Sequence, residues 1–163
     1  MSICAFTGYR PEKFPFDDNE TDPRCEQLKQ KLFCEILRMT REGVNVFMSG
    51  MARGVDLWAA EAVLQIQNVK PSQKIELWAI VPYDRQPLAW SAKERVRYQR
   101  ILEQAAHVEY ISHDYYNGCL QKRNRYMVDH VDYLIAYAWH PASSARELVE
   151  YAQRKQQIHI QLL

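Results

Sequence analysis

One turn of the chain combines glycine, hydroxyl and charged side chains in a pattern that suits anion binding. The turn Ser49-Gly50-Met51-Ala52-Arg53-Gly54-Val55-Asp56 lies between a predicted strand and an alanine-rich predicted helix. Backbone N–H groups at a helix start carry positive potential, so a phosphate is favoured there. Gly50 permits a tight bend, Gly54 permits a close approach, and Ser49 supplies a hydroxyl donor. Two glycines at this spacing also serve purely structural turns, so both interpretations stay open.

Two carboxylates near this turn are the candidate catalytic residues. Asp56 in the first helical turn suits the helix dipole as a structural acid, and it could equally hydrogen-bond a ribose hydroxyl. Glu61 follows five residues later, where it could face solvent, cap a loop or reach a pocket. In an enzyme, either acid would stabilise an oxocarbenium-like centre while Arg10 or Arg53 holds a phosphate.

A second candidate segment, Thr7-Gly8-Tyr9-Arg10-Pro11, follows the first predicted strand. The loop after a central strand borders the crevice in which α/β sheets bind their ligands. Thr7, Gly8 and Arg10 are therefore predicted to contact ligand, because the planar guanidinium of arginine matches phosphate or carboxylate oxygens. An exposed arginine without a ligand is the alternative.

Three later residues complete the predicted binding set. Trp90 closes the loop after the third predicted strand, where a base or sugar ring could stack, although such aromatics also pack loops. Arg123 and Asn124 near a helix start suit phosphate or ribose contact, although alternating basic residues also form solvated helix faces. Ser144 belongs to a strand-to-helix turn in which Ser143 and Ser144 could also act simply as the helix cap.

The sequence lacks the motifs of common cofactor and nucleophile sites. It contains no Gly-x-Gly-x-x-Gly fingerprint, no Walker lysine loop and no Gly-x-Ser-x-Gly elbow. The four cysteines and five histidines show no metal-ligand spacing. We therefore expect no metal site, no dedicated cofactor and reduced thiols.

The elements that must position these residues alternate between apolar, β-rich runs and segments of helical period. This alternation predicts a Rossmann-like α/β fold, a doubly wound and mostly parallel sheet between two helix layers. Strands are expected at 3–7, 44–48, 74–81, 108–111, 133–137 and 158–163. Helices are expected at about 23–42, 55–67, 91–105, 120–130 and 145–156. The long irregular segment 9–21 is either a functional loop or a plain surface excursion.

Length and composition place the chain among ordinary globular proteins. With 163 residues, we expect one domain spanning 1–163. A hydrophobic fraction of 47%, a charged fraction of 25% and a formal charge of +1 argue against disorder and against nucleic acid as a partner. No apolar run approaches a membrane span and no signal segment is visible, so a cytoplasmic location is expected. A homo-oligomer is possible.

The motifs described above resemble those of one known family. They are Ala5-Phe6-Thr7-Gly8-Tyr9-Arg10-Pro11, the 49–61 segment, Val81-Pro82-Tyr83 with Trp90, and the 121–129 segment. Together they resemble the YpsA family of uncharacterised proteins within the SLOG superfamily, and the resemblance extends over nearly the whole chain. It implies a Rossmann-like fold related to the Lonely Guy phosphoribohydrolases and to the DNA-binding protein DprA.

The resemblance also implies a ligand class. SLOG domains bind nucleotides or nucleotide-derived ligands, some as hydrolases and some as sensors, which would place Gly8, Ser49, Gly50, Gly54 and Asp56 in the pocket. Lonely Guy enzymes carry a Pro-Gly-Gly-x-Gly-Thr-x-x-Glu loop, whereas this chain has Pro141-Ala142-Ser143-Ser144-Ala145-Arg146-Glu147. Each side chain that replaces a glycine adds a Cβ where backbone would approach phosphate.

Three functional hypotheses follow, in order of preference. The first is binding or sensing of a nucleotide or nucleotide-derived phosphate without a reaction. The second is phosphoribohydrolase-like cleavage of the N-glycosidic bond of a nucleoside monophosphate. The third is single-stranded nucleic acid binding, which needs a positive stripe with stacking aromatics, for which Arg95, Arg97, Arg100 and Tyr98 are available.

Overall fold

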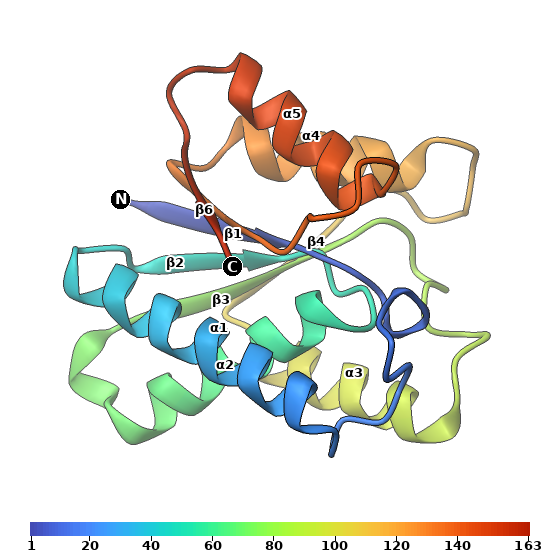
Figure 1. Ribbon diagram of the computed structural model, residues 1–163, viewed down its shortest axis with the longest axis horizontal. Coiled ribbons are helices and arrows are strands. Elements are labelled where there is room, and N and C mark those ends of the chain that lie inside the picture. Colours follow the sequence, from blue (N-terminus) through green and yellow to red (C-terminus); the bar gives the residue numbers. More distant parts are fainter.

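Six parallel strands form one sheet in the computed structural model, which describes residues 1–163 (Figure 1). The strand order is β4-β3-β2-β1-β5-β6. All five neighbouring pairs run parallel, with Ala5 opposite Met48 on one side of β1 and Leu134 on the other. The strands are β1 (Ile3–Thr7), β2 (Val46–Ser49), β3 (Glu76–Val81), β4 (His107–Tyr110), β5 (Tyr133–Ala136) and β6 (His159–Leu162).

Five α-helices cover the two faces of the sheet. Figure 1 shows α1, α2 and α3 on one face and α4 and α5 on the other. They are α1 (Pro23–Arg41), α2 (Val55–Val69), α3 (Ala92–Gln104), α4 (Cys119–Asp129) and α5 (Ser144–Arg154). Side chains of Asp22, Ser91 and Ser143 accept hydrogen bonds from first-turn N–H groups and so begin α1, α3 and α5. Two 3₁₀ turns, Pro11–Lys13 and Pro71–Gln73, complete the structure.

The strand order reverses between β1 and β5. Moving outward from β1, the chain adds β2, β3 and β4 on one side and then β5 and β6 on the other. Such a reversal leaves a crevice beyond the carboxyl ends of the two central strands, because their following segments turn to opposite faces. The segments after Thr7 and after Ala136 therefore border the crevice.

The 9–21 loop lies packed against the sheet and α2. Phe14 and Phe16 are buried and stack with ring centroids 4.8 Å apart, and Phe14 also contacts Trp58 and Tyr137. Tyr9 packs edge-on against Tyr137 at 5.2 Å. Burial of these aromatic rings fixes the loop in one position, so it forms a wall beside the crevice.

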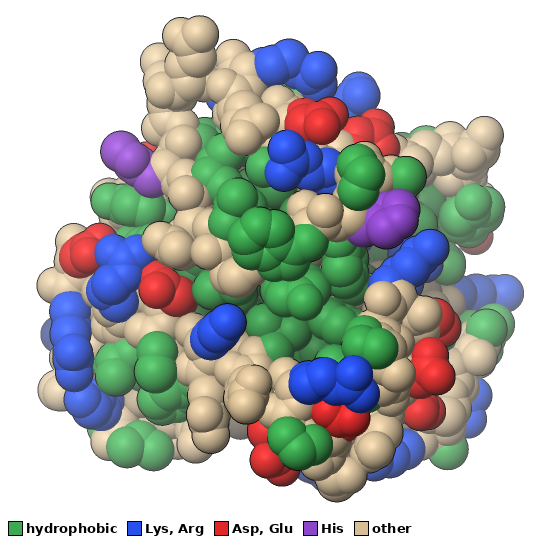
Figure 2. Space-filling model, viewed as in Figure 1, with side chains coloured by type: hydrophobic (Ala, Val, Ile, Leu, Met, Phe, Trp, Pro, Cys, Tyr) green, Lys and Arg blue, Asp and Glu red, His purple; other side chains and the backbone are tan.

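The apolar surface seen from one side lies between the two helix layers. Figure 2 shows apolar side chains gathered across the middle of this view, near the chain end marked in Figure 1. Trp139 and Leu162 are exposed, and the Trp139 indole donates a hydrogen bond to the Leu163 carbonyl at 2.6 Å. No helix has the length and apolar character needed to cross a membrane.

The fold expected from the sequence is confirmed. Every predicted strand and helix is present, with ends shifted by one or two residues in most cases, and the sheet is entirely parallel. The expected starts at Asp22-Pro23 and Ser91 are found as N-caps. The four cysteines are free thiols, and no group of three or more potential ligands is placed to hold a metal ion.

Candidate ligand-binding site

A cavity of about 470 Å³ opens at the carboxyl ends of the strands, beside the reversal in strand order. Its walls come from the loop after β1, the start of α2, the first turns of α4 and the segment that leads into α5. The lining residues are Thr7, Gly8, Tyr9, Arg10, Glu12, Lys13, Ala52, Asp56, Leu120, Gln121, Arg123, Asn124, Arg125, Ala142, Ser143, Ser144, Glu147 and Leu148. Most of these residues are polar, and four are cations.

The floor of the cavity holds two buried charged side chains from opposite faces of the sheet. Asp56 on α2 is 7% exposed and Arg123 on α4 is 4% exposed. The Arg123 guanidinium donates to the Gly50 carbonyl through Nη1 and to the Asn124 side-chain oxygen through Nε at 2.7 Å. Asp56 accepts one long hydrogen bond, from the Ala52 N–H at 3.4 Å. Both side chains therefore keep hydrogen-bonding capacity that is directed at the cavity.

Burial and mutual attraction act in opposite directions on these two groups. Burial raises the pKa of the Asp56 carboxyl, while the charge on Arg123 and the Ala52 N–H lower it and offset only part of the rise. Burial lowers the pKa of Arg123, and the Asp56 charge opposes that change. A guanidinium keeps its proton in proteins, so Arg123 stays a buried cation. It faces the Asp56 carboxyl, whose ionisation is weakened by burial.

The mouth of the cavity is cationic. Arg10 is exposed, and neither Arg10 nor Lys13 forms an ion pair or a side-chain hydrogen bond with the protein. The start of α5 faces them, with Ser143 capping the helix by accepting from the Arg146 N–H at 3.1 Å. Unpaired cations and a helix N-terminus together favour an anion at the mouth.

Half of the predicted site residues are brought together in this cavity. Thr7, Gly8 and Arg10 enter from the β1 loop, and Asp56, Asn124 and Ser144 enter from α2, α4 and α5. Thr7 is nearly buried at the end of β1, and its hydroxyl has no protein partner. The Asn124 side chain uses its oxygen for Arg123 and leaves its NH₂ group free. These six residues remain our candidates for ligand contact.

Ser49, Gly50 and Gly54 do not line the cavity, although Ala52 and Asp56 of the same turn do. The Ser49 hydroxyl donates to the Asp56 carbonyl at 2.8 Å and accepts from the Met51 N–H at 3.1 Å, so it serves the turn. A Cβ at Gly54, which has a φ of 86°, would lie 2.3 Å from the Tyr9 carbonyl oxygen. A Cβ at Gly50 would lie 2.5 Å from the Arg123 guanidinium. Gly54 therefore allows the close approach of the Tyr9 backbone, and Gly50 allows that of the Arg123 side chain. The β1 loop occupies the position beside Gly54 where a phosphate was expected.

The remaining predicted residues form contacts around the 9–21 loop. Arg53 pairs with Glu12, and its guanidinium lies 5.9 Å from the Trp90 ring centroid. Glu61 pairs with Arg97 of α3 and does not reach the cavity. These three residues therefore support the loop from outside, and Glu61 lacks the position that a catalytic acid would need.

Several cavity residues were not part of the predicted set. Lys13 belongs to the irregular loop, Glu147 to the first turn of α5, and Gln121 and Arg125 to α4. The sequence predicts Arg123 as a possible phosphate or ribose contact beside Asn124, but it does not predict that the side chain is buried at the floor. Its position on the inner face of α4, four residues before the buried Met127, was the available signal.

The sequence profile of the YspA SLOG family (YpsA) matches residues 4–163. The chain belongs to this family. Relatives of this SLOG-family chain include UPF0398 proteins of Bacillus cereus (strain B4264) and Bacillus thuringiensis (strain Al Hakam), each 32% identical over 162 residues. Each alignment covers 97% of this chain and 86% of the relative.

Solved structures of DNA processing protein A (DprA) share the fold of this SLOG-family chain. The protein from Streptococcus pneumoniae gives a TM-score of 0.64 at 16% identity, covering 99% of this chain and 50% of DprA. The protein from Helicobacter pylori, described for its single-stranded DNA binding mode, gives 0.65 at 21% identity, covering 99% and 64%. TM1055, a structural genomics target, gives 0.57 at 12% identity, covering 98% and 72%. The chain thus spans about half to two thirds of the DprA chains.

Proposed function

We propose that this chain binds a nucleotide or a nucleotide-derived phosphate in the cavity between the β1 loop and the starts of α4 and α5. The observation that carries the proposal is the combination of location and chemistry. The cavity lies at the reversal in strand order, and unpaired polar groups line it from floor to mouth. Membership of the SLOG family supports a small-molecule ligand of this kind.

The distribution of charge supports an orientation for the ligand. Arg10, Lys13 and the start of α5 attract the phosphate at the mouth, where water can reach the charges. The Asp56 carboxylate and the Thr7 hydroxyl suit the hydroxyl groups of a sugar, because a carboxylate accepts hydrogen bonds and a threonine both donates and accepts them. Arg123 supplies a further donor at the floor.

A thermal-shift screen tests the proposal. A ligand that binds only the folded state raises the apparent stability, by about 2.7 kcal/mol when its concentration is 100 times the Kd. The screen uses nucleoside monophosphates, ADP-ribose and NAD, with the matching nucleosides as controls. The phosphate-bearing members are expected to raise Tm more than the nucleosides do. No shift with any phosphate compound would contradict the proposal.

Hydrolysis of a nucleoside monophosphate is the second candidate. The observation in its favour is that Asp56 and Glu147, two of the three carboxylates that line the cavity, lie respectively buried at the floor and at the start of α5, while the third, Glu12, is paired with Arg53. Asp56 would stabilise positive charge that develops on the sugar during loss of the base. The side chains of Ser143 and Ser144 argue against hydrolysis, because they occupy the turn that is glycine-rich in Lonely Guy enzymes.

Chromatography of the products separates the two candidates. If the chain is a hydrolase, free base accumulates with at least one nucleoside monophosphate, and accumulation stops in Asp56→Asn. Glu103→Gln is the control, since Glu103 is exposed on α3, lies outside the cavity and forms no ion pair, so its variant should retain activity. Absence of free base across the panel, together with a thermal shift, supports binding without chemistry.

Single-stranded nucleic acid binding along α3 has less support. Tyr98 is buried, and Arg97 is fully engaged by carboxylates, so neither side chain is presented as part of a stacking stripe. The likeness to DprA is below 25% identity and concerns the fold. Retention of a labelled single-stranded oligonucleotide by the protein at low salt would support this hypothesis.

A further inference from the structure

The 9–21 loop supplies much of the cavity wall, yet it has little regular structure of its own. Tyr9, Arg10, Glu12 and Lys13 all line the cavity, and the loop contains only the 3₁₀ turn Pro11–Lys13. Its own backbone hydrogen bonds close only short turns, and such loops open easily unless contacts with the rest of the molecule hold them. The position of Arg10 and Lys13 therefore depends on what fixes the loop.

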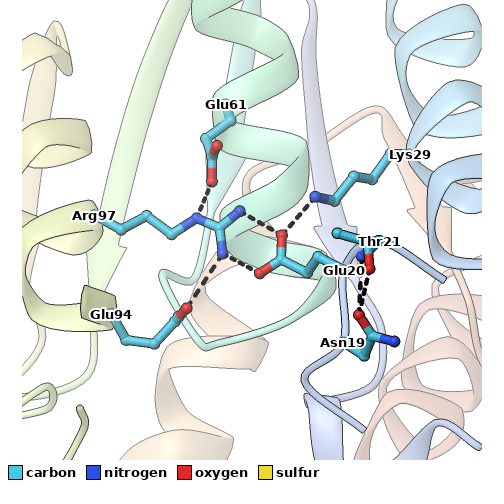
Figure 3. A network of polar contacts seen from close by, with 7 residues as sticks. All are labelled: Asn19, Glu20, Thr21, Lys29, Glu61, Glu94 and Arg97. Atoms are coloured by element: carbon cyan, nitrogen blue, oxygen red, sulfur yellow. Dashed lines mark hydrogen bonds and ion pairs between the residues drawn. The ribbon is translucent and has the colours of Figure 1, made fainter. Parts of the chain in front are cut away.

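The far end of the loop is held by one side chain of α3. The Arg97 guanidinium donates to both carboxylate oxygens of Glu20, with N–O distances of 2.6 and 2.7 Å (Figure 3). The Arg97 side chain is only 18% exposed. Planar, two-point pairing of this kind is directional, and a lysine cannot reproduce it.

Arg97 also forms hydrogen bonds with carboxylates of two helices. Its Nε donates to Glu61 of α2, and its Nη1 lies 3.3 Å from Glu94 of the same helix. Lys29 of α1 gives Glu20 a second cation at 2.5 Å. Figure 3 shows the Arg97 guanidinium between Glu20, Glu61 and Glu94, with Lys29 on the other side of Glu20. The Glu20 carboxylate therefore contacts α1 and α3 directly, and α2 only through Arg97.

The electrostatics of the contact favour a fixed geometry. Half-burial of Glu20 opposes its ionisation, but the hydrogen bonds and charges of Arg97 and Lys29 outweigh burial and lower its pKa to about 2. Glu20 is therefore charged at neutral pH. A second tie, between Arg53 and Glu12, holds the end of the loop nearest the cavity.

We infer that Arg97 is a positioning residue for the ligand site. It does not line the cavity, and it acts by holding the 9–21 loop so that Arg10 and Lys13 face the bound phosphate. The part of this inference that concerns ligand affinity rests on the proposed function. The part that concerns the loop stands on the contacts of Arg97 alone.

Hydrogen exchange of the full chain tests the loop. Arg97→Met is expected to speed amide exchange in residues 10–21 by about tenfold or more, which matches the loss of a charge-assisted pair. Exchange in β1 and β2 should stay unchanged. Arg97→Lys should give an intermediate value because lysine provides only a point charge. Arg100→Met is the matched control, since Arg100 is exposed on the same helix and forms no side-chain contact.

Two further variants keep the test decisive if Arg97→Met folds poorly. Glu20→Gln removes the charge that pairs with both Arg97 and Lys29 and leaves the pairs of Arg97 with Glu61 and Glu94, so its loop should exchange at least as fast as in Arg97→Met. Glu61→Gln should change loop exchange less than Glu20→Gln. Equal exchange in Glu20→Gln and Arg100→Met would overturn the inference. Faster exchange throughout the chain would also overturn it, because Arg97 would then be a general stability residue.

Titration with AMP separates this inference from the proposed function. If the wild type binds AMP, Arg97→Met and Glu20→Gln should weaken binding by about tenfold through loss of the loop position. Unchanged affinity in both variants would contradict the role of Arg97 in the site. If the wild type binds no phosphate compound, the proposed function fails, and the exchange data still decide whether Arg97 holds the loop.

Discussion

The Asp56 carboxylate and the Arg123 guanidinium face one another across Gly50. A Cβ built on Gly50 lies 2.8 Å from Oδ2 of Asp56 and 2.5 Å from Nη1 of Arg123. Helices on opposite faces of the sheet thus deliver the two charges to one point beyond β2. The absence of a side chain at residue 50 is what allows this arrangement.

Gly50→Ala should disturb the floor of the cavity. The added methyl group meets two buried polar groups, so one of them must move, at a cost of about 1–3 kcal/mol in free energy of unfolding. Urea denaturation measures the change, and ligand affinity should fall with it. Wild-type stability in Gly50→Ala would show that the guanidinium shifts freely and is not held in place.

Arg123→Met should be more destabilising than Asp56→Asn. Removing the guanidinium takes the cation from the buried Asp56 carboxyl and also removes the hydrogen bonds to the Gly50 carbonyl and the Asn124 oxygen, at a total cost of about 3–5 kcal/mol. Asn at residue 56 keeps the shape and removes the charge, so the double variant should be more stable than Arg123→Met alone. Denaturant unfolding of all three variants gives the coupling free energy, and strict additivity would argue against an interaction between the two residues.

The ion network around Glu20 predicts acid sensitivity. The pKa of Glu20 falls from 4.5 to about 2 on folding, so between these values the unfolded chain binds more protons than the folded one. Glu20 therefore contributes about 1–3 kcal/mol to the free energy of unfolding. This contribution is complete above pH 4.5 and is lost as the pH falls towards 2.

Glu20→Gln should therefore flatten the acid limb of the stability curve. Chemical denaturation at a series of pH values measures it. Glu103→Gln is the control, because Glu103 is exposed and forms no ion pair. A curve for Glu20→Gln that is parallel to the wild-type curve below pH 4.5 would contradict the assignment.

Arg10 and Lys13 should govern the salt dependence of ligand binding. Alanine at both residues is expected to weaken binding of a phosphate compound by about tenfold or more, because each unpaired cation contributes a charge-assisted contact. The remaining affinity should depend less on ionic strength. Lys93→Ala, an exposed lysine on α3 outside the cavity, should leave both properties unchanged.

The sequence predicts the architecture well because local signals and burial agree. Each strand is a short apolar run, and the Asp22-Pro23 and Ser91 signals mark real helix starts. The region of the site also follows from the sequence, because parallel strands bring their carboxyl ends to one edge. Thr7, Arg10 and Asp56 are predicted in this way, and all three line the cavity.

The partners of the site residues depend on tertiary contacts that no local pattern reports. The sequence pattern indicates that Gly54 binds phosphate, but the close approach that Gly54 permits is that of the Tyr9 backbone. Glu61 reads as a candidate acid, and only the packing of α2 against α3 reveals its pair with Arg97. Arg123 lies in a basic segment that resembles a solvated helix face, whereas its side chain is buried under the cavity.

Amide NMR of the isotope-labelled chain titrated with AMP tests the central claim most directly, because it reports both whether and where the ligand binds. The proposal predicts saturable shift changes confined to the cavity lining, at residues 7–13, 52–56, 120–125 and 142–148. It predicts much smaller changes along α3. Shift changes centred on α3, or none with AMP, ADP-ribose or NAD, would contradict a nucleotide site in this cavity.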